Sequence, residues 1–589
     1  MFKKSQLYIG LFVICSGLSG VSINALADGG GSLAAKKMLA ASTAQGQLGA
    51  IDVNPYGNAP LTAVIDLAGK HITDVEVTVH GKGENGVNIN YPVDSETLQT
   101  HDGVPLFGLY ANYRNNITVS YKLDGKKIVE KYKLQTGGIS TKYNELMVRP
   151  FPEVEPITVA KGFEDRLYWI NSQTSNRYHK DIKWANGGSL DWNYQSVNYI
   201  TDTNGDIRWI LDDSSFTDDQ NIMGRGFIMG VHQVSNGEII FGKGQKYYRM
   251  DLLGRMIKSL PLPRGYSDFS HEIREMDNGH YLIRAAKRNY VKPSGEIVTT
   301  VRDHILEVDQ SGNLVEVWDL NTILDPMRDT LLVALDAGAV CLNVDDTLSG
   351  KKVKIEPDMP YGDIPGVGAG RNWAHVNSID YDEKDDTIII SPRHQATAIK
   401  IGRDKKVKWI LGAPDGWTGE LATKVLQPVD SKGNDISCTL GKCDGDFDWG
   451  WTQHTSWLNK EKNTLTVFDN GDGRGFEQPA IPSMKYSRAV EYKINEDDMT
   501  VEQVWEYGKE RGYDWFSAIT SVTNYEADKD TMFIFSASAG LFNKDWTKPV
   551  LNEIKYGTDE VMVELQIHNA GPREPSYRAL VIKPEKAFH

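Results

Sequence analysis

The chain has 589 residues and a formal net charge of −15 at pH 7. This length predicts several domains or one large closed repeat, because a single hydrophobic core rarely grows so large. The acidic balance argues against binding to nucleic acid or to an anionic membrane surface.

The first 27 residues have the pattern of a secretory signal peptide. Lys3 and Lys4 form a basic start, an apolar stretch covers residues 7–21, and Ala25-Leu26-Ala27 provides a small-x-small cleavage site. We expect cleavage after Ala27, so that the exported chain begins at Asp28. No later run of about 20 apolar residues occurs, so we expect no membrane-spanning helix.

Residues 28–150 are predicted to form an N-terminal β-sandwich domain. Its clearest predicted strands cover residues 72–79, 117–123 and 127–134. Asp124-Gly125 joins the last two strands, and this dipeptide is a strong hairpin signal. The prolines near residue 150 mark the linker to the next domain.

Residues 151–589 repeat a unit of about four strands. Each unit has a short strand, an Asn/Asp/Gly turn and an apolar strand, followed by two strands around an Asp/Gly turn, the second often ending near Trp. Five units are clear, and we expect residues 157–211 to form a sixth with strands near the C-terminus. The repeat is typical of propeller blades. The predicted fold is all-β, an N-terminal β-sandwich followed by a six-bladed β-propeller catalytic domain; an array of β-sandwiches is the alternative.

Four histidines occupy nearly the same place in four predicted blades: His232, His271, His375 and His454. The first strand of a blade lines the central channel, so we expect these positions to converge near the axis. A lone histidine in a strand is usually structural, whereas four at one repeat position indicate a shared site. His232 has the fewest polar neighbours and is the weakest member.

Two further residues are predicted to join this site. Asn377 follows His375 by two positions and therefore points to the same face of the strand. Arg393 ends the next strand, and its guanidinium suits an oxyanion. His394 is predicted to point away and to be structural. Imidazoles, an amide and a guanidinium together predict a pocket for sulfate, phosphate or carboxylate.

Three cysteines remain after the signal peptide is removed. Cys438 and Cys443 lie close together in a polar loop, and we expect a disulfide between them in an oxidising compartment. Two free thiols are the alternative, and a metal knuckle lacks the CxxC spacing. Cys341 is interpreted as a buried structural thiol.

Other catalytic motifs are missing from the sequence. We find no nucleotide-binding GxxxxGK[ST] loop, no GxSxG elbow and no HExxH pair. No cofactor is therefore expected.

The run Asp448-Trp449-Gly450-Trp451-Thr452-Gln453-His454 is distinctive, and the cysteine pair lies shortly before it. With the segments around His271, His375 and Arg393, this run resembles the bacterial periplasmic arylsulfate sulfotransferases, which use no nucleotide sulfate donor. The resemblance covers essentially the whole exported chain. It implies a periplasmic homodimer whose disulfide is made by a thiol oxidase.

The resemblance also implies roles for the site residues. His454 would be the nucleophile that is transiently sulfurylated, in a ping-pong transfer of a sulfuryl group from a phenolic sulfate ester to a phenol. His271, His375, Asn377 and Arg393 would hold the sulfuryl oxygens. From the chemistry of the transfer, we expect a second imidazole to act as acid and base, and we favour His271 for this role.

Two other functions remain open from the residues alone. Three convergent histidines suit a zinc or copper centre, as in a metal-dependent hydrolase of sulfate or phosphate esters. A propeller that binds without catalysis is the second alternative.

Overall fold

The computed structural model describes residues 43–139, 141–144, 147–149, 151–177, 194–217, 224–338, 346–476, 485–541, 547–569 and 574–589. The predicted signal peptide and Cys341 lie outside these ranges. Among the described residues, no helix has the length and apolar character needed to cross a membrane.

The N-terminal part contains two antiparallel sheets. One has the order β1 (Ile51–Val53), β2 (Ala63–Asp66), β5 (Gly103–Leu106), and the other β4 (Ile89–Val93), β3 (Ile72–Val79), β6 (Arg114–Leu123), β7 (Lys126–Gln135). The helix α2 (Ser95–His101) precedes β5. Asp124 and Gly125 connect β6 to β7 with φ of 50° and 76°, as a tight hairpin turn requires. The three predicted strands and their hairpin are confirmed.

Six antiparallel sheets follow, and each is one blade of the propeller. The first three, written in hydrogen-bonded order, are β13 (Ile207–Ile210), β12 (Tyr194–Asp202), β11 (Leu167–Arg177), β40 (Ser576–Val581); then β14 (Ile228–Gln233), β15 (Ile239–Lys243), β16 (Lys246–Met250), β17 (Met256–Pro261); then β18 (Tyr266–Ser267) and β19 (Ile273–Glu275) on β20 (Tyr281–Lys287), β23 (His304–Val308), β24 (Leu314–Asp319).

The other three blades have the same plan. They are β25 (Val376–Asp382), β26 (Thr387–Pro392), β27 (Ala398–Ile401), β28 (Val407–Leu411); then β32 (Thr455–Asn459), β33 (Thr464–Asp469), β34 (Arg488–Asn495), β35 (Thr500–Tyr507), β29 (Gln427–Val429); then β36 (Val522–Glu526), β37 (Thr531–Ser536), β38 (Val550–Lys555), β39 (Val561–His568), β10 (Glu153–Val159). Among the blade strands in the described residues, β29 is the one that pairs in parallel, with β35.

Several short elements lie outside these sheets. They are the two-stranded sheets β8 (Thr141–Asn144) with β9 (Met147–Arg149), β21 (Tyr290–Val291) with β22 (Ile297–Val298) and β30 (Cys438–Thr439) with β31 (Lys442–Cys443), and the helices α3 (Leu320–Ile323), α4 (Gly419–Ala422) and α5 (Pro584–Ala587).

The two ends of the chain close the ring. The C-terminal strand β40 pairs with β11 as the innermost strand of the first blade, and β10 pairs with β39 as the outermost strand of the last. Neighbouring inner strands contact one another from β40 and β14 through β19, β25 and β32 to β36. The predicted sixth blade, built from both ends of the chain, is confirmed.

The recurring tryptophan has a physical role. Trp209, Trp318 and Trp409 lie in the outermost strands of their blades, with at most 1% of their surface exposed. Each indole N–H donates to the next blade: to the Leu252 carbonyl at 2.7 Å, the Gly402 carbonyl at 3.1 Å and the Glu496 carboxylate at 3.0 Å, respectively. The recurring tryptophan therefore marks the contacts between one blade and the next.

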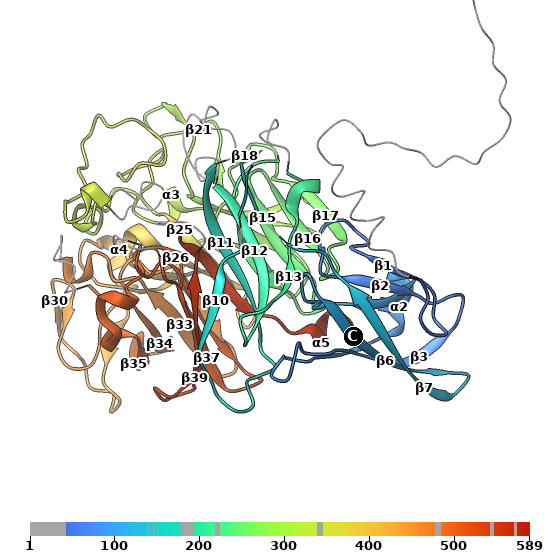
Figure 1. The fold of residues 1–589 in the computed structure, drawn as a ribbon. Coiled ribbons are helices and arrows are strands. Elements are labelled where there is room, and N and C mark those ends of the chain that lie inside the picture. The colour runs from blue at the N-terminus through green and yellow to red at the C-terminus, as the bar shows by residue number, and fades with distance from the viewer. Residues whose placement is uncertain are drawn as a thin grey trace, which may run out of the picture.

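The N-terminal sheets pack on the first two blades, where Figure 1 shows β1 and β2 beside β16 and β17. Arg208 of the first blade donates to the carbonyls of Gly108 at 2.9 Å and Val87 at 2.8 Å. The C-terminal Phe588 packs against Tyr91, with 4.7 Å between the ring centroids. The division between domains at residue 150 stays a prediction.

Candidate active site

Three of the predicted histidines meet at the centre of the propeller. His375 and His454 directly precede the inner strands β25 and β32, and His271 lies two residues before β19. The ring centroids of His271 and His375 are 5.1 Å apart, and those of His271 and His454 are 5.7 Å apart. All three side chains are buried. The structure thus brings together residues from three different blades.

The backbone at this centre is strained. His271 and His375 have φ of 70° and 50°, in the left-handed region that side chains rarely adopt. Such conformations persist only where the surroundings enforce them, and they cluster at functional sites.

His232 does not join the cluster, and its predicted equivalence to the other three is wrong. It lies near the end of β14, inside the strand, whereas the others precede their strands. Its Nε2 lies 2.6 Å from a Glu272 carboxylate oxygen, and its ring packs against Trp457 at 5.3 Å. His232 therefore belongs to a polar network beside the site.

The hydrogen bonds of His454 define its reactive nitrogen. Its Nδ1 lies 2.9 Å from the carbonyl oxygen of Ser521, which can only accept, so Nδ1 carries the proton. In the neutral ring, Nε2 then has a free lone pair. This Nε2 is buried and has no hydrogen-bond partner. His454 thus has a buried nitrogen lone pair that forms no hydrogen bond with the described residues.

His375 has the opposite tautomer. Its Nδ1 accepts from the guanidinium of Arg302 at 2.9 Å and from the amide of Asn372 at 2.7 Å. Asp363 holds that guanidinium with two contacts, at 2.7 and 2.6 Å. Because Nδ1 accepts, the proton of the neutral ring is on Nε2, which is buried without a partner. His375 therefore presents an N–H donor where His454 presents a lone pair.

His271 completes the trio, with its Nδ1 hydrogen-bonded to the hydroxyl of Ser270 and its Nε2 buried without a partner. Tyr577 lies beside it: its ring centroid is 6.0 Å from that of His271 and 5.2 Å from that of His454. The sequence reasoning missed Tyr577. It would have been found by aligning the C-terminal strand β40 as the first strand of its blade.

Asn377 and Arg393 lie where they were predicted, next to the histidines. The Asn377 amide donates to the carbonyl of Gln453 at 2.7 Å, and its own oxygen is buried without a partner. The Arg393 backbone N–H donates to the His375 carbonyl at 3.1 Å, and its guanidinium donates to the Ala518 carbonyl at 3.1 Å. Both residues therefore connect blades around the site.

His394 was predicted to point away from the site. Its Nδ1 donates to the Asn372 carbonyl at 2.7 Å, as a structural residue would. Its ring nevertheless packs on His375, with the centroids 4.6 Å apart. His394 thus supports the face of His375 from within the same blade.

The site keeps its histidines neutral. Burial, followed by the charge of Arg302, lowers the pKa of His271 and His375 well below the ordinary value. Burial, followed by the charge of Arg578, does the same to the pKa of His454. A neutral imidazole keeps a lone pair on one ring nitrogen, so these shifts leave each of the three rings with one nitrogen that can accept a proton or act as a nucleophile.

With the role that the family resemblance implies for His454, we expect its attack on an aryl sulfate to resist acid. A lowered pKa leaves His454 unprotonated until the pH falls far below about 6.5, the ordinary value for histidine. The rate of phenolate release in a single turnover should therefore change little between about pH 8 and pH 6. A half-maximal rate near pH 6.5, measured by stopped-flow absorbance with a chromogenic aryl sulfate, would contradict this assignment.

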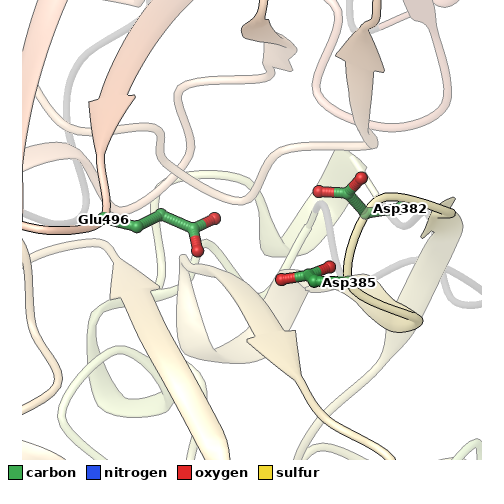
Figure 2. A group of neighbouring side chains, drawn as sticks. All are labelled: Asp382, Asp385 and Glu496. Atoms are coloured by element: carbon green, nitrogen blue, oxygen red, sulfur yellow. The ribbon is translucent and has the colours of Figure 1, made fainter.

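A metal-dependent hydrolase would need several ligand atoms close together, and the described histidines of the central cluster do not form such a group. In the described part of the chain, the one group of three ligand residues lying within 4.8 Å of one another is Asp382, Asp385 and Glu496 (Figure 2). The ammonium of Lys400 already lies 2.9, 2.8 and 2.6 Å from these carboxylates, respectively. This group is an ion-pair cluster between blades.

The predicted disulfide between Cys438 and Cys443 is confirmed. It closes the hairpin of β30 and β31, whose turn residue Gly441 has a φ of 71°. A Cβ at Gly441 would lie 2.6 Å from the indole of Trp451, so the hairpin packs tightly on the segment that leads to His454.

These features define a β-propeller with a buried cluster of neutral histidines at its centre, surrounded by arginine and amide side chains. A sequence profile described as arylsulfotransferase (ASST) matches residues 153–578, and one described as an arylsulfotransferase Ig-like domain matches residues 50–137. The chain belongs to the arylsulfotransferase family.

Two curated relatives support this assignment. The chain is 51% identical to the arylsulfate sulfotransferase AssT of Escherichia coli O6:H1 and 50% identical to that of Lelliottia amnigena. Each comparison covers 92% of this chain and 94% of the relative. Among solved structures, a Bacteroides caccae protein of unknown function matches 71% of this chain and 99% of its own, with 10% identity and a TM-score of 0.35, too low to support an argument.

Proposed function

We propose that this enzyme moves a sulfuryl group from a phenolic sulfate ester to a phenol through a sulfurylated His454. The observation that carries this proposal is the fixed tautomer of His454, with a buried Nε2 lone pair beside two neutral imidazoles. This nitrogen attacks sulfur, the bond between sulfur and the phenolic oxygen breaks, and the phenolate leaves. A second phenol oxygen then attacks the same sulfur and releases His454.

The neighbouring groups act on the sulfuryl oxygens and the phenols. His375 donates its Nε2 proton in a hydrogen bond, and Arg393 adds a charged donor, because negative charge spreads over these oxygens during transfer. Asn377 orients the sulfuryl group. His271, which is neutral in this site, accepts the proton of the incoming phenol in the second half-reaction and passes that proton to the phenolate that departs from the next donor.

We also propose a cellular location, a partner and an oligomeric state for the enzyme. The signal-peptide pattern, with cleavage after Ala27, and the Cys438–Cys443 disulfide support a periplasmic location, with a thiol oxidase as the partner that forms the bond. The family resemblance supports a homodimer. Sequencing the N-terminus of protein from the periplasmic fraction and measuring its native mass test these points; a start other than Asp28, or a monomer, would contradict them.

Exhaustive dialysis against a chelator separates this function from the metal-dependent hydrolase. We expect the dialysed enzyme to transfer the sulfuryl group at an unchanged rate, because imidazole needs no metal to attack sulfur. The products are measured by chromatography with a phenol acceptor present. Activity that disappears on dialysis and returns with zinc or copper would favour the metal alternative.

A further inference from the structure

A further arginine beside the histidine cluster has no hydrogen-bond partner for its terminal nitrogens among the described residues. Arg284, in β20, is fully buried. Its Nε donates to the carbonyl of Ser270 at 3.0 Å, whereas both terminal nitrogens are buried without a hydrogen-bond partner. Leaving a buried guanidinium in this state is costly, since charged groups in protein interiors are nearly always paired.

The other arginines of this region have carboxylate neighbours. Arg302 is held by Asp363 at 2.6 Å, and Arg578 by Glu272 at 2.9 Å. Arg393 lies near enough to Asp472 to lower the pKa of that carboxyl, which burial raises to about 6. Arg284 differs from Arg302 and Arg578 because, among the described residues, no carboxylate forms a hydrogen bond with either of its terminal nitrogens.

Arg284 is close to the reacting groups. Ser270, whose carbonyl it binds, immediately precedes His271, and the charge of Arg284 contributes to the lowered pKa of His271. Burial, followed by the charge of Arg302, lowers the pKa of Arg284 itself to about 9, so the guanidinium stays charged at neutral pH. The charges of Asp268 and Asp363 raise the pKa of Arg284, but neither carboxylate forms a hydrogen bond with this guanidinium.

We propose that Arg284 is a further substrate-binding residue that supplies the counter-charge for the sulfate of the donor and selects esters with a single negative charge. This inference rests on the proposed function of the site. An aryl sulfate carries one negative charge and has oxygens that can accept from the two terminal nitrogens of Arg284, which have no partner among the described residues. A phosphate monoester carries a second charge above a pKa of about 6 and would leave that charge buried without a partner.

The test uses methyl sulfate, a monoanionic ester, and methyl phosphate at about pH 8, where it is a dianion. We expect wild-type enzyme to bind methyl sulfate more tightly in calorimetric titration. The substitution Arg284→Met should weaken methyl sulfate binding roughly 10- to 100-fold, because a charged hydrogen bond is lost. It should not lower the unfolding temperature without ligand, because it removes an unpaired buried charge.

Arg208→Met is the matched control, because Arg208 is equally buried but is paired with Asp202 at 2.8 Å, far from the site. It should lower the unfolding temperature and leave methyl sulfate binding unchanged. Arg284→Gln, which also removes the charge, replaces Arg284→Met if the latter fails to fold, with the same expected loss of affinity. Wild-type affinity in the Arg284 variants, or equal affinity of the wild type for both esters, would overturn the proposal.

Binding of methyl sulfate requires no covalent chemistry. The same titration is therefore compared with the intact mass of wild-type enzyme after mixing with an aryl sulfate. Methyl sulfate binding that depends on Arg284, in wild-type enzyme that never forms a sulfurylated histidine, would leave this inference standing while the proposed mechanism fails.

Discussion

His454→Ala enzyme incubated with a chromogenic aryl sulfate and no acceptor gains no sulfuryl group and releases no burst of phenolate. The substitution removes the one lone pair that the Ser521 carbonyl fixes toward the site. Without the nucleophile, turnover should fall by a factor on the order of 10⁴ or more, as in other enzymes that lose their covalent residue. Intact-protein mass and the absorbance of released phenolate measure both effects.

His232→Gln is the control for this experiment. His232 lies near the axis but contacts Glu272 and Trp457 instead of the histidine cluster. Glutamine keeps a donor for Glu272, so this variant should be labelled at close to the wild-type rate. If His454→Ala protein became labelled at another histidine as fast as wild type, the assignment of the nucleophile would be wrong.

Arg393→Ala slows both half-reactions but still permits slow labelling of His454. The guanidinium stabilises charge and forms no covalent bond, so its loss removes about 3 kcal/mol of stabilisation, roughly a hundredfold in rate. Rapid-quench measurements of sulfurylation, and of its reversal by a phenol, would show the two rates falling together.

Arg393→Lys tests the geometry of this contribution. An ammonium keeps the charge but cannot reproduce two parallel donors on one oxyanion, so it should restore little of the lost rate. A lysine variant with nearly wild-type rates in both half-reactions would show that Arg393 acts through charge alone. An alanine variant that cannot be labelled at all would instead make Arg393 essential to the bond-forming step.

The sequence was sufficient to predict the blades and most of the histidine cluster. Strand periods and turn residues repeat in each blade, and tryptophans such as Trp209 and Trp318 mark contacts to the next blade. A closed ring then brings equal repeat positions together, which is why His271, His375 and His454 could be placed at one centre. The same reasoning failed for His232, because it depends on where each inner strand begins.

Sequence patterns could not predict several other features of the site. The tautomer of His454 depends on a carbonyl of the sixth blade, and that of His375 on Arg302 of the third. Arg284 lies on a second strand, outside the repeat position that marked the histidines. Tyr577 lies on the strand that returns from the far end of the chain. These contacts are set by tertiary packing alone.

The central claim is that His454 carries the sulfuryl group between two phenols. Its most direct test is the intact mass of wild-type enzyme mixed with an aryl sulfate without acceptor, followed by peptide mapping of the modified residue. The account predicts one added sulfuryl group per chain, located on His454 and removed on addition of a phenol. Steady transfer to a phenol without any such adduct, or an adduct on a different residue, would contradict it.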